Sequence, residues 1–369
     1  MQNKKGALAF LIVGILLVLI ALVIKVVIYP SMAVWPDDVD AVRTYDGTLH
    51  TMLNPAALET MDLANLFMSE VPITIERHVT TEETKGNKAI VLEAVTTSAP
   101  DGSVIGLLSM DSWYAIDRKT MNAVPDFSGN DKIPHREGLV IGFPIGTEKK
   151  DYPGWNGDVQ ELADAVFVRE EKHEESGLDT YIFEGKSLAK EIVDPEKLAL
   201  FPPAVPKDLL LALAGGIELP EALQAPFAMI LPNLPDLVPL KYTYEYETVY
   251  WIEPTTGVLV DYSKHEVRQV ALAKDLLLGA IPEGVELPEE VTQLLPMLPD
   301  PLPLLPVMDM EYVTAASSVQ DAAKDAKDNK GLIDLLGTTV PMLLVVGGLV
   351  LGVIGVVLFL RKPAEAEQV

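Results

Sequence analysis

The sequence predicts an α+β membrane protein with an antiparallel β-rich extracytoplasmic domain, helical insertions, and a transmembrane helix at each end. Three observations predict this class. An uninterrupted apolar run lies near each terminus, and the long stretch between the runs alternates apolar and polar residues as half-buried strands do. The composition, 49% hydrophobic and 22% charged residues in a chain of 369, supplies enough apolar side chains for a packed core.

The first apolar run covers residues 7–24 and follows Lys4 and Lys5. As a helix it would be about 27 Å long, at ~1.5 Å per residue, which is enough to cross a hydrocarbon core. A cleaved signal peptide is the alternative, but this run is longer than the apolar core of most signals. We therefore expect cytoplasmic residues 1–6 and a transmembrane helix over residues 7–29.

The second apolar run covers residues 340–360 and ends at the basic pair Arg361-Lys362. We expect a transmembrane helix over residues 338–360 and a cytoplasmic tail over residues 361–369. Lys and Arg next to a span favour the cytoplasmic side. The charges beside both runs thus predict a two-pass protein of the cell membrane, with both termini in the cytoplasm and the main domain outside.

Small residues recur on both predicted spans. Gly348 and Gly352 are four residues apart on the second, and Gly14 and Ala21 are one heptad apart on the first. Small residues at such spacings let helix backbones approach closely in a membrane. We expect the two helices to pack through these positions, within one chain or between chains.

The domain between the spans, residues 30–314, has the two-residue period of β-strands. The alternation is visible in residues 71–81 and 88–117. The clearest element is residues 241–270, in which Pro254-Thr255-Thr256-Gly257 has the composition of a turn between two strands. This pattern predicts a long antiparallel hairpin.

Three tyrosines, Tyr242, Tyr244 and Tyr246, share one face of the first strand of this hairpin. Such a stripe can line a ligand groove or pack across strands on a half-buried sheet. The sequence leaves both alternatives open.

Two Leu/Pro-rich stretches, residues 204–240 and 272–306, interrupt the predicted sheet and resemble each other. The matching segments are Lys207-Asp208-Leu209 with Lys274-Asp275-Leu276, Glu218-Leu219-Pro220-Glu221 with Glu286-Leu287-Pro288-Glu289, and Leu234-Pro235-Asp236 with Leu298-Pro299-Asp300. These matches indicate an internal duplication. Since the hairpin would bring Lys241 beside Ala271, we expect the two copies to pack as short helices.

Each copy carries three consecutive leucines, which are Leu209, Leu210 and Leu211 in the first and Leu276, Leu277 and Leu278 in the second. These helices are too short to span a membrane and too apolar to stand alone in water. Mutual burial of the two copies is the first explanation for these leucines. An interface with a second copy of the chain or with another membrane subunit is the second hypothesis, and an apolar ligand cleft between the copies is the third. After them, residues 315–337 predict an alanine-rich surface helix that leads to the second span.

The charge and the missing residue types exclude several functions. The formal net charge of −26 argues against nucleic acid and anionic headgroups as partners of the surface. Zero cysteines exclude disulfides and thiol chemistry. The GxxxG of Gly142 and Gly146 lacks the lysine and hydroxyl of a phosphate loop, and Pro144 and Pro153 oppose its helix. Without ligand spacings among the histidines either, we expect no metal, no cofactor and no catalytic residues.

Residues 135–155 carry a specific motif. Its residues are His135, Gly138, Leu139, Phe143, Pro144, Thr147, Glu148, Lys149, Tyr152, Pro153 and Trp155, and a later hairpin adds Trp251, Glu253, Pro254, Thr256 and Gly257. Together they resemble the PorA family of two-span membrane proteins, best known from actinobacteria and largely of unknown function. The resemblance implies the order of span, β-rich exterior, Ala/Asp-rich helix and span over nearly the whole chain. The Leu/Pro-rich copies depart from typical members.

These observations together predict a non-enzymatic envelope protein that acts as an oligomer or as an accessory subunit of a membrane assembly. A protein that binds or transfers a lipid or another apolar ligand is the first alternative. The second is a porin-like channel. Two apolar helices in one chain do not form a transmembrane β-barrel, so a channel would need several copies.

Overall fold

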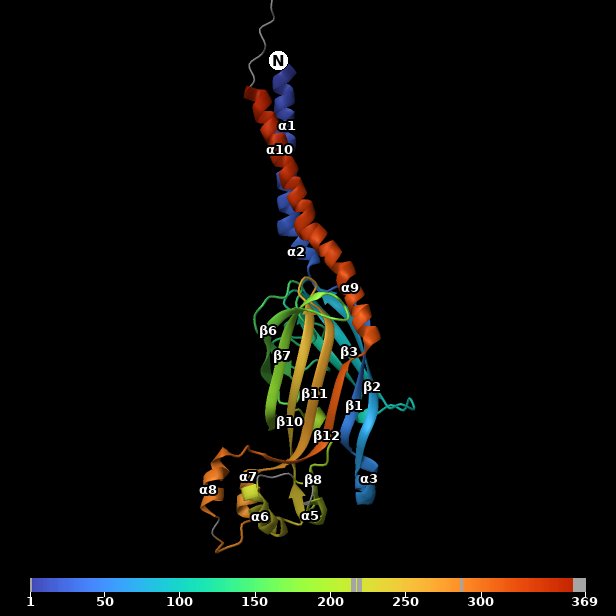
Figure 1. The fold of residues 1–369 in the computed structure, drawn as a ribbon, viewed down its shortest axis with the longest axis vertical. Helices are drawn as coiled ribbons and strands as arrows, with labels where there is room; N and C mark the ends of the chain where they lie inside the picture. Colours follow the sequence, from blue (N-terminus) through green and yellow to red (C-terminus); the bar gives the residue numbers. More distant parts are fainter. Residues whose placement is uncertain (1, 214–216, 218–220, 286–287, 361–369) are drawn as a thin grey trace, which may run out of the picture.

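The computed structural model describes residues 2–213, 217, 221–285 and 288–360. Two helical segments from opposite ends of the chain lie side by side and project from a β-domain (Figure 1). The first contains α1 (Gln2–Val23), the π-helix η1 (Ile24–Ile28) and α2 (Tyr29–Met32), and the second contains α9 (Ala316–Asp334), the π-helix η7 (Leu335–Thr339) and α10 (Val340–Leu360). We call this pair, residues 2–32 and 316–360, the stalk. Both segments are long and apolar enough to cross a membrane.

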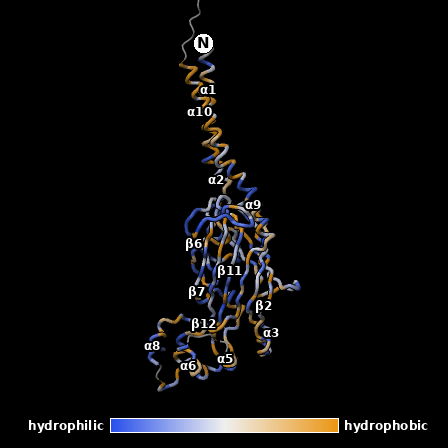
Figure 2. The backbone as a smooth tube through the Cα atoms, in the orientation of Figure 1, coloured by the Kyte–Doolittle hydropathy of each residue, from blue (hydrophilic) through white to orange (hydrophobic). Residues whose placement is uncertain are grey.

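Small residues allow α1 and α10 to pack closely. A Cβ atom added at Gly14 would lie 2.6 Å from the carbonyl oxygen of Gly348 and 3.0 Å from the backbone nitrogen of Gly352. Ala21 is also buried. The structure thus brings the residues predicted for helix packing together within one chain. Figure 2 shows that both helices are hydrophobic along most of their length. Many of their apolar side chains are exposed, such as Leu8, Ile15, Leu349 and Val353.

The β-domain is built on one antiparallel sheet with the order β4-β3-β2-β1-β12-β11-β10-β7-β6-β5. Its strands are β1 (Asp40–Leu53), β2 (Phe67–Lys85), β3 (Lys88–Ser98), β4 (Met110–Asp117), β5 (Tyr152–Asn156), β6 (Glu161–Lys172), β7 (Asp179–Glu191), β10 (Lys241–Glu253), β11 (Val258–Leu272) and β12 (Leu302–Thr314). This arrangement confirms the predicted antiparallel sheet between two apolar terminal helices.

The sheet curls into a half-barrel. Isolated bridges join Ile116 of β4 to Ala123, Asn122 to Leu139, and Leu139 to Gly154 of β5. The connection after β4 therefore links the two edge strands. Twist of neighbouring strands drives such curling, and the linking segment covers edges that would otherwise be open.

The predicted hairpin is confirmed. β10 and β11 pair antiparallel from Lys241 opposite Ala271 to Glu253 opposite Val258, and the turn lies at residues 254–257. This turn lies at the end of the sheet next to the stalk, which we call the stalk end (Figure 1). The opposite end, which carries the Leu/Pro-rich copies, we call the far end.

The two copies fold alike, each as two short helices and a 3₁₀ turn. The first contains α5 (Lys207–Leu213), α6 (Glu221–Ile230) and η5 (Leu231–Asn233), and the second contains α7 (Lys274–Gly279), α8 (Glu289–Leu294) and η6 (Leu295–Met297). Lys207 Nζ binds Asp236 Oδ1 at 3.1 Å, and the Lys274 backbone N–H binds the equivalent Asp300 Oδ1 at 3.1 Å. Of the second matching pair, residues 218–220 and 286–287 lie outside the described residues.

The leucines of both copies enter one hydrophobic cluster. Leu209, Leu210 and Leu277 are buried there, and Leu276 packs against it. Leu211 stays 38% exposed and Leu278 46% exposed. An interface with another chain stays a prediction that rests on these two exposed side chains and their surroundings, because the other leucines are covered within this chain.

The smaller elements complete the two ends. They are α3 (Pro55–Thr60), η2 (Leu63–Asn65), η3 (Gly106–Leu108), α4 (Pro195–Leu198), β8 (Ala204–Pro206) and β9 (Leu237–Pro239). At the stalk end, α9 packs Val319, Ala323 and Ala326 against Val260 of β11. The helix expected over residues 315–337 therefore exists, with one face on the sheet, and it continues into α10.

Candidate functional site

The half-barrel encloses a cavity of about 460 Å³. Its walls are mostly aromatic and aliphatic. The tyrosines that line it are Tyr45, Tyr244, Tyr246, Tyr250, Tyr262 and Tyr312, and the methionines are Met52, Met110, Met308 and Met310. Ligand pockets in proteins commonly have this size and combine an apolar lining with a few polar groups.

The cavity is elongated along the sheet. On β11 its lining runs from Leu259 near the stalk end to Arg268 near the far end. Nine residue steps along a strand correspond to about 30 Å at ~3.3 Å per residue. Pro55, Met110 and Leu200 are among the exposed lining residues. The cavity therefore opens toward the far end, where these residues lie.

A cluster of buried charges lies on the inner face of the sheet. Lys264, Glu266 and Arg268 occupy alternate positions of β11 and therefore point to the same side. Lys264 Nζ lies 2.9 Å from Glu266 Oε2, and Arg268 Nε donates to Asp158 Oδ1 at 2.9 Å. The hydroxyl of Tyr244 donates to Glu266 Oε2 at 2.6 Å. All five residues line the cavity.

The cluster holds its members in their charged forms. Burial alone would raise the pKa of Glu266, but Lys264 and Arg268 beside it and the Tyr244 hydroxyl lower that pKa to about 2. Burial would lower the pKa of Lys264, yet Glu266 and the surrounding tyrosines keep it well above the ordinary value. Both groups are therefore ionised at neutral pH, in surroundings largely without solvent.

This cluster was not predicted from the sequence. Its local signal is the alternation of Tyr262, Lys264, Glu266 and Arg268 in the second strand of the hairpin, where an inner face would otherwise be apolar. Asp158 is 110 residues away from Arg268 in the chain and could not be paired with it from sequence.

The tyrosine stripe serves both of the roles left open. Tyr244 and Tyr246 line the cavity and stack with ring centroids 5.6 Å apart. Tyr242 instead stacks on Phe201 at 4.8 Å, and its hydroxyl donates to the Pro202 carbonyl at 2.6 Å. The stripe thus passes from core packing at the far end into the cavity wall.

A second buried ion pair closes the barrel over the cavity. Arg77 Nε binds Glu93 Oε1, and the hydroxyl of Tyr114 donates to Glu93 Oε2 at 2.7 Å. Arg77 Nη2 also donates to the carbonyl of Ile141 at 3.1 Å. The Arg77 side chain thus holds the linking segment against the sheet.

The motif at residues 135–155 forms the wall of the cavity on the stalk side. Phe143 lines the cavity and packs against Tyr152 and Phe183, with ring centroids 5.5 and 4.8 Å apart. The Thr147 hydroxyl donates to the Pro144 carbonyl at 2.7 Å. Gly138 and Trp155 lie beside the Leu139 bridge to β5, whereas His135, Glu148 and Lys149 are exposed. The motif therefore builds a structural wall, and only part of it faces the cavity.

The two motif segments, far apart in sequence, meet at the stalk end. Gly257 has φ +72°, and a Cβ atom there would lie 2.7 Å from the carbonyl oxygen of Phe143 and 2.6 Å from that of Pro144. The Gly146 backbone N–H donates to the Thr255 carbonyl at 3.2 Å. Only glycine fits this turn without displacing the loop.

A fully buried carboxylate fastens the same turn to the stalk. Glu253 is 0% exposed, and its Oε2 accepts hydrogen bonds of 2.8 Å from the backbone N–H and the hydroxyl of Thr256. Its Oε1 lies 2.8 Å from Nζ of Lys330 in α9. The hairpin turn and the helix that continues into α10 are thus linked through one side chain.

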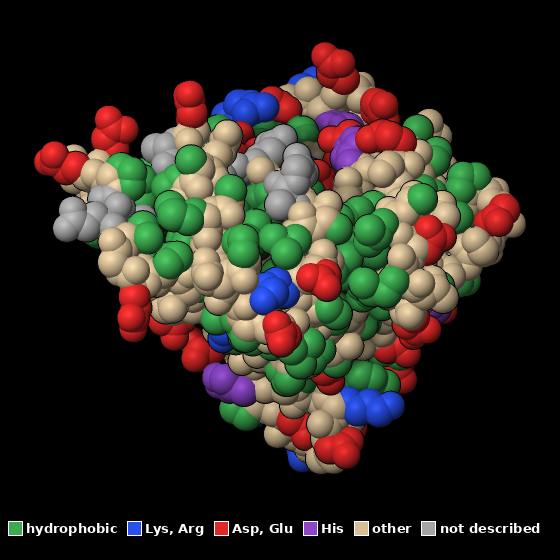
Figure 3. All heavy atoms as spheres, turned by 90° about the horizontal axis from the view of Figure 1, so that it is seen from below, with side chains coloured by type: hydrophobic (Ala, Val, Ile, Leu, Met, Phe, Trp, Pro, Cys, Tyr) green, Lys and Arg blue, Asp and Glu red, His purple; other side chains and the backbone are tan. Residues whose placement is uncertain are grey.

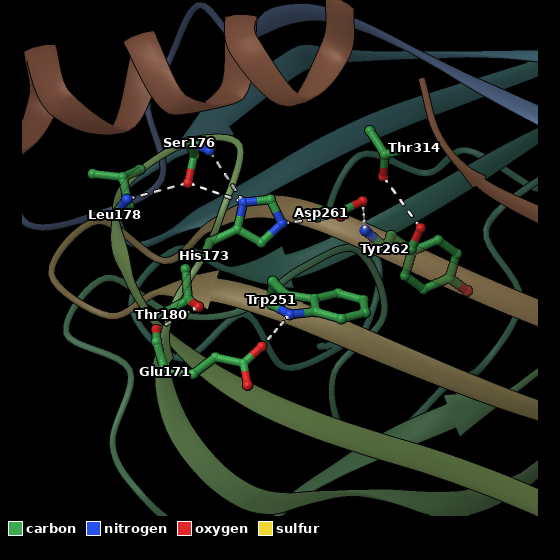
Figure 4. A network of polar contacts seen from close by, with 9 residues as sticks. All are labelled: Glu171, His173, Ser176, Leu178, Thr180, Trp251, Asp261, Tyr262 and Thr314. Atoms are coloured by element: carbon green, nitrogen blue, oxygen red, sulfur yellow. Dashed lines mark hydrogen bonds and ion pairs between the residues drawn. The ribbon is translucent and has the colours of Figure 1, made fainter. Parts of the chain in front are cut away.

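The structure also brings a serine, a histidine and an aspartate together (Figure 4). His173 Nδ1 lies 3.1 Å from Ser176 Oγ, and Nε2 lies 3.1 Å from Asp261 Oδ2. Ser176 Oγ is buried in the turn between β6 and β7 and accepts the backbone N–H of Leu178 at 3.2 Å. None of the three side chains lines the cavity described above. Their contacts close the turn and tie it to β11.

The comparisons with known proteins come to two findings. The family model described as Porin PorA matches residues 6–357, which is nearly the whole chain, and confirms the resemblance found in the two motifs. No curated protein gives a significant match.

Proposed function

The chain belongs to the Porin PorA family, and we propose that it is a membrane-anchored protein that binds an amphipathic or apolar molecule inside its half-barrel. The family and the two apolar helices indicate a membrane protein. The two-pass orientation, with both termini in the cytoplasm and the β-domain outside, is part of the proposal and rests on Lys4 and Lys5 at the first span. Arg361 and Lys362 lie outside the described residues.

One observation carries this proposal, the elongated cavity. Its volume of about 460 Å³ falls in the range of small-molecule sites, and its tyrosine, methionine and leucine lining offers an apolar surface. Methionine side chains adapt to flexible apolar ligands, and tyrosine rings offer large apolar faces. A binding role without chemistry also agrees with the expectation of a non-enzymatic protein.

The proposal is tested on the full-length chain purified in mild detergent. We expect native mass spectrometry to show a co-purifying lipid or lipid-like molecule. Val95 lines the cavity and Thr96, its neighbour on β3, faces out and is exposed. Val95→Trp should reduce the bound fraction severalfold by filling the cavity, and Thr96→Trp should leave it unchanged. A wild-type protein that carries no ligand and binds none of several added lipids would refute the proposal.

A second candidate function is a channel formed by several copies. The family description and the exposed apolar faces of α1 and α10 favour it. Leu211 and Leu278 at the far end would add to contacts between copies or with an accessory subunit. Reconstituted protein would then conduct ions across a planar bilayer, and Leu211→Lys with Leu278→Lys would lower its oligomeric state. A monodisperse monomer without conductance excludes the channel and leaves the binding proposal in place.

A further inference from the structure

We infer that the cavity contains a headgroup site, formed by Lys197 and Arg268 near its mouth, for the carboxylate or phosphate of a single-chain anionic amphiphile. This inference rests on the proposed function, because it names the ligand class of the same cavity. It assigns the polar end of the ligand to the far end and the acyl chain to the wall of tyrosines and methionines.

The guanidinium of Arg268 has unused hydrogen-bonding capacity. Its Nε binds Asp158 Oδ1 at 2.9 Å, but Nη1 is directed at the thioether sulfur of Met308 at 3.0 Å. Nη2 lies 3.8 Å from Glu266 Oε2, beyond hydrogen-bond range. Arg268 is more than nine-tenths buried. A thioether is a weak acceptor, so two terminal nitrogens of a buried cation lack strong partners.

The ammonium group of Lys197, beside the mouth of the cavity, also has a thioether sulfur as its hydrogen-bonding partner. Lys197 lies in α4, and its Nζ is 2.8 Å from the sulfur of Met110, another lining residue. Burial lowers the pKa of Lys197 and neighbouring Arg268 lowers it further, against the attraction of Asp158, Glu266 and Asp194. An ammonium group without a carboxylate at hydrogen-bond distance is thus placed on the ligand side of the cavity wall.

The cations in this part of the cavity are unevenly paired. Lys197, Lys264 and Arg268 lie near the carboxylates of Glu266, Asp158 and Asp194, so the charges are equal in number. Glu266 and Asp158 bind Lys264 and Nε of Arg268, which leaves Nζ of Lys197 and the two terminal nitrogens of Arg268 without a carboxylate at hydrogen-bond distance. One carboxylate or phosphate from a ligand would give these nitrogens charge-assisted hydrogen bonds.

The cavity can present cations to a ligand although the surface of the protein is acidic. The chain as a whole carries −26, which argues against anionic headgroups at the surface. Inside, the nearest charges dominate because the low-dielectric surroundings strengthen short-range interactions.

The dimensions suit one acyl chain. The lining extends for about 30 Å along β11, whereas a hydrocarbon core of about 30 Å contains two leaflets, so one chain spans roughly 15 Å. With the headgroup at Lys197 and Arg268, the chain would lie along Met308, Met310 and Tyr262 toward the stalk end.

The test compares three probes on the full-length protein in an uncharged detergent: palmitate, hexadecyl phosphate and the neutral methyl palmitate. We expect at least one anionic probe to bind the wild type at least about tenfold more tightly than methyl palmitate, since hydrogen bonds to charged groups contribute that much. Their ratio tells a carboxylate site from a phosphate site. Lys197→Met should remove the preference and leave methyl palmitate binding unchanged, and Lys197→Arg should retain it.

Lys190→Met is the matched control, since Lys190 lies on β7, is half exposed and pairs with Glu161 outside the cavity lining. It should bind all three probes like the wild type. Equal binding of methyl palmitate and both anions would overturn the headgroup site while the proposed function stands. Binding of none of the three would count against both. A Lys197→Met protein that is folded by circular dichroism and keeps the anion preference would also overturn the inference.

Discussion

The stalk end and the far end of the β-domain are held together in different ways. At the stalk end, a glycine turn, a proline-rich loop and α9 are joined by directional contacts around the buried carboxylate of Glu253. At the far end, the two Leu/Pro-rich copies pack through buried leucines, and Leu211 and Leu278 remain partly exposed. Figure 3, which views the molecule from below, shows apolar side chains gathered on this end among scattered acidic ones. Hydrogen bonds, an ion pair and close backbone contacts therefore hold the stalk end, whereas burial of apolar side chains holds the far end.

The difference matters for the cavity, because its opening lies at the far end. Elements with few directional contacts open at lower free-energy cost than interlocked ones. The cavity wall on the stalk side is built from the interlocked motif, and the mouth lies beside the short helices. The comparison predicts that the largest loss of stability follows from a change at the stalk end.

The largest effect is expected at Gly257. Gly257→Ala places a Cβ atom within 2.7 Å of two carbonyl oxygens and forces alanine to adopt φ +72°. Strain and overlap together should lower the stability by about 4 kcal/mol. Gly284 at the far end has φ +80° with no atom within 4 Å of the added Cβ, so Gly284→Ala should cost about 1 kcal/mol. Thermal unfolding in detergent compares the two, and equal losses would contradict the proposed interlock.

The next largest loss of stability is expected at Leu210 of α5, in contrast to its neighbour Leu211. Leu210 is 2% exposed within the shared cluster, so Leu210→Ala should lower the stability by about 3 kcal/mol. Leu211 is 38% exposed, and Leu211→Ala should cost less than about 1 kcal/mol. Denaturant unfolding measures both. A Leu211→Ala loss as large as that of Leu210→Ala, together with a lower oligomeric state, would show that a partner covers Leu211.

The smallest effect concerns His50, on the half of β1 that leads to the far end. The hydrogen bond to Glu70, at 3.1 Å, raises the pKa of His50, and Glu311 lies 3.6 Å away. Because the folded-state pKa is the higher one, this contact stabilises the fold fully below pH ~6.5 and is lost as the pH rises through the folded-state value. His50→Gln should remove a few tenths of a kcal/mol at pH 6 and nothing at pH 9. An equal loss at both pH values would indicate a packing role.

Much of the architecture could be predicted because it depends on local patterns in the sequence. The apolar runs, the hairpin with Lys241 opposite Ala271, and the duplicated helices follow from periodicity, turn residues and repeats, which act over short distances. The motif also indicated the family. The sequence did not indicate which residues of the motif face the cavity. Phe143 lines the cavity, whereas His135 does not.

Only part of the candidate site could be predicted from the sequence. The alternation of Lys264, Glu266 and Arg268 places these charges on one face of a strand, but nothing local says whether that face meets solvent or a cavity. Asp158 and Lys197 join them from a β-turn and a short helix that are distant in sequence. The Ser176, His173 and Asp261 contacts arise in the same way, from a turn meeting another strand.

The sequence by itself determined the two apolar helices, the antiparallel hairpin, the repeat and the family, because hydrophobic period and turn chemistry are properties of neighbouring residues. The tertiary structure alone decided that the sheet curls and is linked edge to edge, that this leaves a cavity, and that the cavity carries unevenly paired charges. The physical reason is that curvature and closure depend on contacts between strands and loops far apart in the chain, and a buried charge acquires its partners only when those contacts form.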